Sequence, residues 1–265
     1  MTFRSLLFVP GSRPERFEKA LAAGADSVCI DLEDAVAPQG KDAAREAVAR
    51  FIAQQTRVGL GVRINGTATS YCAADIVAIK AAEPAFVMVP KVETAHELAG
   101  IGNTMGLPLW PIIESAEGLK NAWDIAAVTG VEGVLFGGAD YSADIGSTLD
   151  WDALLFARGM LVAACARAGV QLLDVPHLDI ADEAGLISST HRVKAMGFTG
   201  RSCIHPGQVA GVNGVFSPTV AEIDRAHRIM AAFEASEGGV AQLDGKLIEL
   251  PVIRAARRTL ERVKD

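Results

Sequence analysis

The chain has 265 residues, of which 50% are hydrophobic and 22% charged, and its formal net charge is −7 at pH 7. This composition excludes a disordered, collagenous or coiled-coil chain, and the acidic balance argues against nucleic-acid binding, which needs a basic patch. The sequence contains no run of the ~18 apolar residues that a membrane helix requires. Its opening, MTFRSLLFVPGSRPER, has only a short apolar part and no small-residue cleavage site, so we expect no signal peptide. We therefore expect a cytoplasmic protein with no membrane or nucleic-acid partner.

The four cysteines, Cys29, Cys72, Cys165 and Cys203, lie far apart, three of them within apolar runs. Their spacing fits neither a zinc site nor a disulfide framework. We expect reduced thiols in the protein core, which agrees with a cytoplasmic location.

Short apolar runs alternate with longer amphipathic stretches along most of the chain. The runs are Leu6–Val9, Ser27–Ile30, Gly59–Ile64, Phe86–Val89, Leu109–Ile113, Gly133–Phe136, Gln171–Leu173 and Arg201–Ile204. Continuous apolar runs are typical of strands that are covered on both faces. The stretches between them predict helices at Glu15–Ala23, Lys41–Gln54, Tyr71–Ala82, Glu93–Thr104, Gly118–Ala127, Leu149–Ala168 and Asp182–Met196, with another after Pro206.

Eight strand–helix units in one chain of this length favour an α/β fold of the TIM type, a (β/α)8 barrel, for which ~250 residues is usual. A doubly wound open sheet is the alternative. The first run is followed by PGSRP, which is neither a dinucleotide-binding fingerprint nor a P-loop, and this favours the barrel.

The last part of the chain exceeds what closing a barrel requires. We expect the barrel to cover residues 1–217 and a C-terminal helical extension, or lid, to cover residues 218–265, packing on the barrel or on a neighbouring subunit. This extension contains predicted helices at Val220–Ala235 and Val252–Val263. Between them, Asp244-Gly245 is a turn signal flanked by apolar residues, which predicts a hairpin.

Ionisable residues follow nearly every predicted strand, where the active sites of such barrels lie. They are Arg13, Asp31, Glu33, Asp34, Arg63, Lys91, Glu114, Asp140, Asp174, His177 and His205. One such residue could be a helix cap or a turn residue. So many together predict a polar site, because buried charge must be matched by partners.

Glu114 and Asp140 end adjacent predicted strands, so their carboxylates can converge on one point. Two close carboxylates repel unless a cation lies between them, and oxygen ligands without histidine or sulfur favour Mg²⁺, or Mn²⁺, over zinc. Arg63 and Arg13 supply fixed positive charge, and a guanidinium suits a bidentate grip on a carboxylate or phosphate. The sequence thus predicts a metal site for an anionic small molecule.

Several motifs make the family resemblance specific. The opening RSLLFVPGSRPERFEKALAAGADSVCIDLEDAVAP resembles that of the citrate lyase beta-subunit family, within the wider HpcH/HpaI aldolase group. The resemblance continues, in order, through VRIN (62–65), VPKVE (89–93), PIIESAEG (111–118), FGGADYSADIG (136–146), GFTGRSCIHPGQV (197–209) and LDGKLIELPVIRAARR (243–258).

The resemblance implies a TIM-like barrel that assembles as a homotrimer or a dimer of trimers, uses Mg²⁺, and cleaves a carbon–carbon bond of β-hydroxyacyl thioesters reversibly. It assigns Glu114 and Asp140 as metal ligands, with Glu114 also facing the substrate. Arg63 becomes the catalytic, substrate-binding arginine, and Asp34, paired with Glu33, a catalytic acid beside the metal. Further residues that it assigns to substrate or carrier binding are Arg13 and Gly138.

Two positions depart from the family pattern. Ala139 stands where a Glu often precedes the metal Asp. Glu249 stands where relatives place an Asp, on a lid that covers a neighbouring subunit's site and transfers a proton. Glu249 is therefore the predicted catalytic acid, with a surface acid of a short strand as the alternative.

We predict from the resemblance a Mg²⁺-dependent lyase that acts on a malyl-, citramalyl- or citryl-type thioester, carried by CoA or by an acyl-carrier protein. One alternative is a pyruvate-type metal aldolase, which usually relies on a histidine near the first strands; here no histidine precedes His96. The other is a non-catalytic or carrier-docking subunit of a citrate lyase-like complex.

Overall fold

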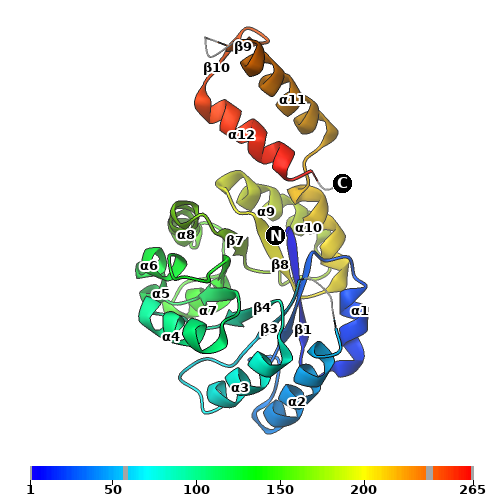
Figure 1. The fold of residues 1–265 in the computed structure, drawn as a ribbon, viewed down its shortest axis with the longest axis vertical. Helices are drawn as coiled ribbons and strands as arrows, with labels where there is room; N and C mark the ends of the chain where they lie inside the picture. Colours follow the sequence, from blue (N-terminus) through cyan, green and yellow to red (C-terminus); the bar gives the residue numbers. More distant parts are fainter. Residues whose placement is uncertain (1, 56–58, 237–240, 264–265) are drawn as a thin grey trace. The chain divides into compact units, whose positions relative to one another are not determined.

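The computed structural model describes residues 2–55, 59–236 and 241–263. Within them, eight parallel strands form a closed barrel (Figure 1). Each strand pairs with the next, and the last pairs with the first, so the (β/α)8 prediction is confirmed and the open sheet is excluded. The strands are β1 (Ser5–Pro10), β2 (Ser27–Asp31), β3 (Leu60–Arg63), β4 (Phe86–Val89), β5 (Leu109–Ile113), β6 (Gly133–Phe136), β7 (Gln171–Asp174) and β8 (Gly200–Cys203).

Helices connect successive strands around the barrel, and one further helix follows the last strand (Figure 1). They are α1 (Phe17–Leu21), α2 (Lys41–Ile52), α3 (Cys72–Ala82), α4 (Ala95–Met105), α5 (Ala116–Lys120), α6 (Ala122–Ala126), α7 (Gly138–Asp144), α8 (Leu155–Ala168), α9 (Glu183–Met196) and α10 (Val209–Phe216). Short 3₁₀ turns precede three of them: η1 (Pro14–Arg16), η2 (Pro38–Gly40) and η3 (Pro206–Gln208).

Two helix predictions were wrong in detail, and one helix was missed. The single helix predicted over Gly118–Ala127 is two short helices, α5 and α6, which meet at Asn121. The helix predicted from Leu149 begins only at Leu155, because turns occupy the residues before it. The short helix α7 was not predicted, since seven residues rich in Gly, Ala and Asp show no helical hydrophobic pattern.

Large apolar side chains fill the interior of the barrel. The buried cluster comprises Phe3, Leu6, Cys29, Phe86, Met88, Trp110, Ile112, Leu135 and Leu173. Phe3 stacks on Trp110 with ring centroids 5.3 Å apart. Two strand glycines make room for the aromatic rings, because a Cβ on Gly61 would lie 2.3 Å from Phe86 and one on Gly133 would lie 2.4 Å from Trp110. The packed base leaves the carboxyl ends of the strands available for a site.

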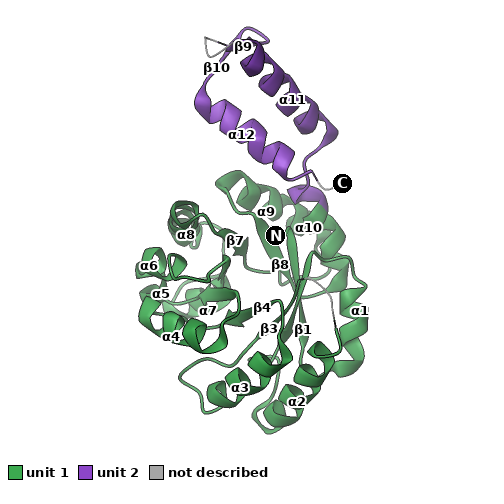
Figure 2. Cartoon of the chain, in the orientation of Figure 1, with its two compact units in different colours: residues 1, 3–213 green, residues 2, 214–265 purple. Residues whose placement is uncertain are grey.

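The chain divides into two compact units, residues 3–213 and 214–265, which Figure 2 shows in different colours. The second unit contains α11 (Val220–Ala235), the antiparallel strands β9 (Ala241–Leu243) and β10 (Lys246–Ile248), and α12 (Leu250–Glu261). It has its own core, formed by Ala226, Ile229, Ala241, Ile248, Ile253 and Ala256. Asp244 and Gly245 both have positive φ in the turn between β9 and β10, which confirms the predicted hairpin.

All four cysteines are free and buried, as predicted. Burial raises the pKa of both Cys165 and Cys203 to about 12, so these thiols stay protonated near neutral pH. No helix in the described part of the chain is long and apolar enough to cross a membrane.

We expect Gly133→Ala to destabilise the protein by roughly 1–3 kcal/mol, because the new methyl group would overlap the fully buried Trp110 ring. The matched control is Gly159→Ala within α8, where a Cβ meets nothing within 4 Å. Replacing that helical glycine should stabilise the protein by about 0.5–1 kcal/mol. Urea unfolding of both variants measures the difference, and equal stabilities would contradict the packing described here.

Candidate active site

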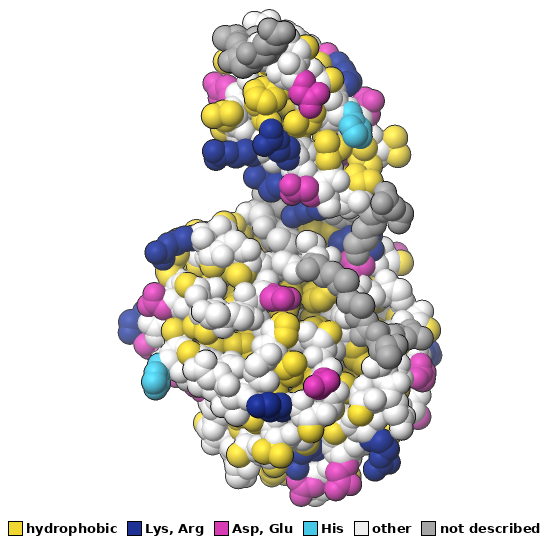
Figure 3. Space-filling model, in the orientation of Figure 1, with side chains coloured by type: hydrophobic (Ala, Val, Ile, Leu, Met, Phe, Trp, Pro, Cys, Tyr) yellow, Lys and Arg dark blue, Asp and Glu magenta, His cyan; other side chains and the backbone are white. Residues whose placement is uncertain are grey.

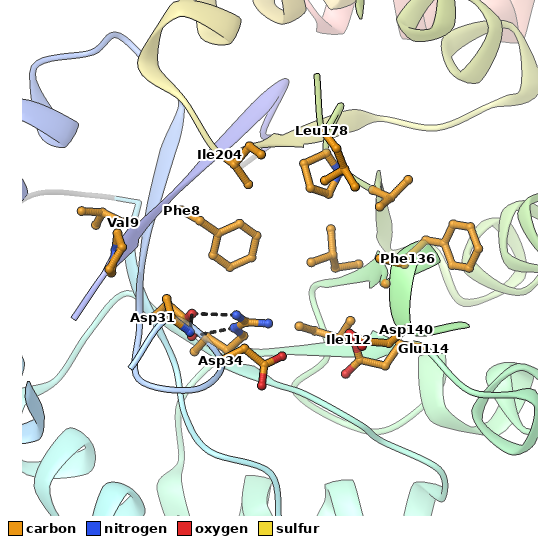
Figure 4. Close-up of a pocket in the computed structure, with 18 residues that line it drawn as sticks. Phe8, Val9, Asp31, Asp34, Ile112, Glu114, Phe136, Asp140, Leu178 and Ile204 are labelled. Atoms are coloured by element: carbon orange, nitrogen blue, oxygen red, sulfur yellow. Dashed lines mark hydrogen bonds and ion pairs between the residues drawn. The ribbon is translucent and has the colours of Figure 1, made fainter. Parts of the chain in front are cut away.

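A pocket of about 360 Å³ opens at the carboxyl ends of the strands. Its charged lining residues are Asp31, Asp34, Arg63, Glu114 and Asp140. Its apolar wall includes Phe8, Val9, Ile112, Leu135, Phe136, Val175, Leu178 and Ile204. Figure 4 shows the carboxylates on the opposite side of the pocket from Leu178 and Ile204. On the face seen in Figure 3, hydrophobic side chains gather over the middle of the barrel unit, with only a few acidic ones among them.

Glu114, directly after β5, and Asp140, in α7 after β6, lie side by side in this pocket (Figure 4). Glu114 is buried, whereas Asp140 is exposed. Burial, together with the negative charges of Glu33 and Asp140, raises the pKa of Glu114 to about 8. A cation between the two carboxylates would relieve this repulsion. Gly137 allows their close approach, because a Cβ there would lie 2.5 Å from the Glu114 side chain.

Arg63, the last residue of β3, is held by two acids. Its Nε and Nη2 donate hydrogen bonds of 2.7 and 2.6 Å to the two carboxylate oxygens of Asp31, which ends β2. Its Nη1 forms a 2.9 Å ion pair with Oε2 of Glu33. The guanidinium also lies over the ring of Phe8, 5.2 Å from the ring centroid. These contacts fix the plane of the guanidinium at the edge of the pocket.

The loop after β2 is fixed by buried hydrogen bonds that sequence analysis did not identify. Asp31 accepts hydrogen bonds from the backbone N–H groups of Glu33 and Ala35, at 2.8 and 3.0 Å. The buried Lys41 ammonium donates to the backbone carbonyls of Leu32 and Glu33, at 2.8 and 2.6 Å. Lys41 lies at the start of α2, and the sequence did not distinguish it from the other charged residues of that helix.

Lys91 was predicted to lie among the charged residues at the strand ends, but sequence analysis assigned it no individual role. Its ammonium donates a 2.7 Å hydrogen bond to Oε1 of Glu33 and lies 3.6 Å from Asp34. Its backbone N–H donates a 2.6 Å hydrogen bond to Oε1 of Glu114. Its place at the end of β4, within VPKVE, was the only available signal.

Within the barrel unit, not all the predicted residues line this pocket. Asp34 lines it and is exposed. Arg13 is exposed, pairs with Glu15 at 3.6 Å, and is absent from the lining. Gly138 is buried in α7, and its neighbours Gly137 and Ala139 form the lining instead. Glu249 is an exposed residue of the second unit, at the N-terminus of α12.

A second cavity of about 330 Å³ shares Phe8, Val9, Pro10 and Ile204 with the first. Arg16, Lys19 and His205 also line it. The two cavities therefore adjoin, one lined by carboxylates and Arg63, the other by basic groups suited to an anion.

The model of the HpcH/HpaI aldolase/citrate lyase family matches residues 4–206. The chain belongs to this family. It is 37% identical to the (3S)-malyl-CoA thioesterase of Cereibacter sphaeroides, over 99% of this chain and 95% of that protein. It is 35% identical to the citrate lyase subunit beta of Leuconostoc mesenteroides subsp. cremoris, over 97% of this chain and 92% of that one.

Among solved structures, this family member is similar to protein CitE from Mycobacterium tuberculosis in complex with magnesium, acetoacetate and coenzyme A. The TM-score is 0.85 at 33% sequence identity, and 98% of each chain is covered. The predicted family and barrel fold are thus both confirmed.

The donor set of this family member suits magnesium. Glu114 and Asp140, the predicted ligands, would supply oxygen atoms only. The described residues contain no cluster of three or more His, Cys, Asp or Glu side chains that could enclose a metal. Two carboxylates with space for water and substrate oxygens match the coordination that Mg²⁺ prefers.

We expect Asp31→Asn to disturb both stability and the site, because Arg63 would lose its charged bidentate partner while remaining largely buried. Removing one member of a buried ion pair costs about 3–5 kcal/mol. The control is Asp42→Asn, which removes an ion pair to Arg45 from an acid whose side chain is 85% exposed; its effect should stay within about 0.5 kcal/mol. Urea unfolding compares the two variants, and similar losses would contradict the importance of the Asp31 contact.

Proposed function

We propose that this protein is a Mg²⁺-dependent carbon–carbon lyase that acts on a carboxylated β-hydroxyacyl thioester of the malyl, citramalyl or citryl class. The observation that carries the proposal is the pairing of Glu114 and Asp140 in one pocket with the rigidly held Arg63. The family membership and the magnesium and coenzyme A of the CitE complex support it.

The substrate has two halves: the acid half, which becomes the keto acid, and the thioester half. Glu114 and Asp140 would hold the metal, which when bound supplies positive charge for the oxygens of the acid half. Arg63 would bind the carboxylate of that half, because its guanidinium is charged at all relevant pH values and fixed in orientation. The hydroxyl would pass its proton to the carboxylate of Asp34, which lines the same pocket and is exposed. Positive charge at this position stabilises the alkoxide that develops as this proton leaves.

Breaking the carbon–carbon bond turns the hydroxyl carbon into the carbonyl of a keto acid. The electron pair of the bond passes to the thioester half as an enolate, which must then accept a proton at carbon. The apolar wall opposite the carboxylates would exclude water from the enolate. We propose Glu249, supplied by a neighbouring subunit, as the proton donor.

The adjoining cavity supports a thioester carried by an anionic group. Arg16 and Lys19 form no ion pair among the described residues, and both line this cavity beside the apolar Phe8 and Ile204. A phosphate-bearing carrier arm could extend along this basic side while its thioester reaches the first cavity. CoA and a carrier protein share the phosphopantetheine chemistry that this arrangement would bind. We further propose a cytoplasmic homotrimer or dimer of trimers.

Thioester hydrolysis is a second candidate function, favoured by the name of the 37% identical (3S)-malyl-CoA thioesterase. The two functions give different products. A lyase releases a keto acid and leaves the thioester bond intact, whereas a thioesterase releases free thiol and a hydroxy acid.

A cleavage screen distinguishes them. Purified protein with Mg²⁺ is incubated with malyl-, citramalyl- and citryl-CoA, and both keto acid and free CoA are quantified. Keto acid formed without an equal amount of free CoA supports the lyase. Free CoA with no keto acid would contradict the lyase and establish the thioesterase.

We expect Glu114→Gln and Asp140→Asn each to weaken Mg²⁺ binding by at least ~10²-fold, because each removes one charged ligand. Calorimetry with Mg²⁺ measures the affinity directly. The control is Glu117→Gln on the exposed surface of α5, where the carboxylate accepts hydrogen bonds from Lys120 and Asn121 and from no other side chain that the structure describes. If both site variants bound Mg²⁺ as tightly as the Glu117→Gln control, the metal assignment would be wrong.

We expect Glu249→Gln to reduce cleavage by ~10²-fold or more while leaving Mg²⁺ affinity unchanged, because a proton donor is lost and no metal ligand is altered. Glu261→Gln, in the last turn of the same helix, serves as the control and should keep full activity.

Subunit mixing tests whether Glu249 acts across a boundary. Mixed assemblies of Glu249→Gln and Glu114→Gln subunits should regain part of the activity, since some neighbouring pairs combine an intact metal site with an intact acid. No recovery, despite demonstrated subunit exchange, would rule out a site shared between subunits.

A further inference from the structure

Lys91 has an unusual backbone conformation, although it lies neither at the end of a helix nor in a hairpin turn. Its φ is 55°, in the left-handed region that side chains other than glycine rarely adopt. Within the described ranges only Glu83 and Asp244 share this property among non-glycine residues. Glu83 caps the end of α3 and Asp244 forms the hairpin turn, whereas Lys91 follows a strand.

The strained backbone directs the N–H of Lys91 to the site. This N–H donates the 2.6 Å hydrogen bond to Oε1 of Glu114. A glycine would adopt the same conformation without strain and present the same N–H. A lysine at this position therefore indicates a separate role for the ammonium.

The backbone N–H of Lys91 contacts Glu114, whereas its ammonium contacts Glu33, which in turn contacts Arg63. The ammonium binds Oε1 of Glu33 at 2.7 Å, and the other oxygen of Glu33 lies 2.9 Å from Nη1 of Arg63. Glu33 has a side chain only 5% exposed, so this is more than a surface ion pair, although the Lys91 side chain itself is 52% exposed. Contacts thus run without a break from Glu114 through Lys91 and Glu33 to Arg63.

We propose that Lys91 is a positioning residue that couples the metal-binding carboxylate Glu114 to the substrate-binding guanidinium of Arg63, its N–H orienting the first and its ammonium, through Glu33, the second. This inference rests on the proposed function, which assigns those roles to Glu114 and Arg63. It makes opposite predictions for the metal and the substrate. Without the ammonium, the Glu33 carboxylate loses one of its two charged partners and can shift, so Nη1 of Arg63 loses the fixed position of its second acid although Asp31 still binds the guanidinium. Mg²⁺ at the same time meets less positive charge near Glu114 and Asp140.

The test uses the full-length protein, calorimetry with Mg²⁺ alone, and then pyruvate, a simple 2-keto acid, added to Mg²⁺-saturated protein. We expect Lys91→Met to bind pyruvate at least ~10-fold more weakly and Mg²⁺ about threefold more tightly. Lys91→Gly should show the same two changes, but its Tm should exceed that of Lys91→Met by ~2–4 °C because the strain is removed. Lys91→Arg should restore pyruvate affinity to within about threefold of the wild-type value.

Two further variants separate coupling from general damage. Lys120→Met, which removes an exposed lysine paired with Glu117, should change neither affinity. In a Glu33→Gln background, Lys91→Met should cause little additional loss of pyruvate affinity, because the connection is already broken.

Two results would overturn the proposal: pyruvate affinity within twofold of wild type in both Lys91→Met and Lys91→Gly, or weaker binding of Mg²⁺ and pyruvate together, as a merely structural defect would produce. Wild-type protein that binds no Mg²⁺ at all would instead overturn the proposed function.

Discussion

The site depends on one electrostatic constraint: several carboxylates share a small, partly apolar space and must be neutralised. Asp31, Glu33 and Glu114 are buried, and Asp34 and Asp140 lie at the pocket beside them. Arg63 pairs with Asp31 and Glu33, and Lys91 pairs with Glu33. Neither forms an ion pair with Glu114 or Asp140 among the described contacts. Burial, and after it the negative charges of Glu33 and Asp140, raise the pKa of Glu114. A divalent cation beside its carboxylate would favour the charged form again.

The barrel makes this concentration of charge possible. Parallel strands bring their carboxyl ends to one face, so residues far apart in the chain meet there. Asp31 and Arg63 are opposite each other in the register of β2 and β3. Their bidentate contact therefore follows from strand pairing, and the 2.8 and 3.0 Å hydrogen bonds from the following loop to Asp31 hold its carboxylate in place. The aromatic core below, around Trp110 and Phe86, gives the strand ends a rigid base.

Much of the fold was predictable because its signals are local. Eight apolar runs separated by amphipathic segments favour a barrel over an open sheet, and all eight form strands of the closed barrel. Helix boundaries were less predictable where short polar segments form helices only through tertiary packing, as in α7. Glu114, Asp140, Arg63 and Asp34 could be predicted because strand ends converge, and the structure places them in one pocket.

The remaining contacts were not predictable, since each depends on three-dimensional detail. The contacts of Lys91 depend on a left-handed backbone conformation, which its residue type does not indicate. The contacts of Lys41 depend on the positions of the Leu32 and Glu33 carbonyls, which the sequence does not give. Arg13 was expected beside Arg63, yet its side chain pairs with Glu15 outside the pocket lining. Glu249 belongs to the second unit, and its part in the reaction stays a prediction.

The central claim is that Glu114 and Asp140 hold a divalent metal that, with Arg63, binds the acid half of the substrate. A crystal structure of the protein with Mn²⁺ and pyruvate tests this most directly, because the anomalous signal of Mn²⁺ locates the metal unambiguously. The account predicts one Mn²⁺ bound by both carboxylates, with pyruvate between it and the Arg63 guanidinium. Mn²⁺ at another position, or pyruvate bound away from Arg63, would contradict the account.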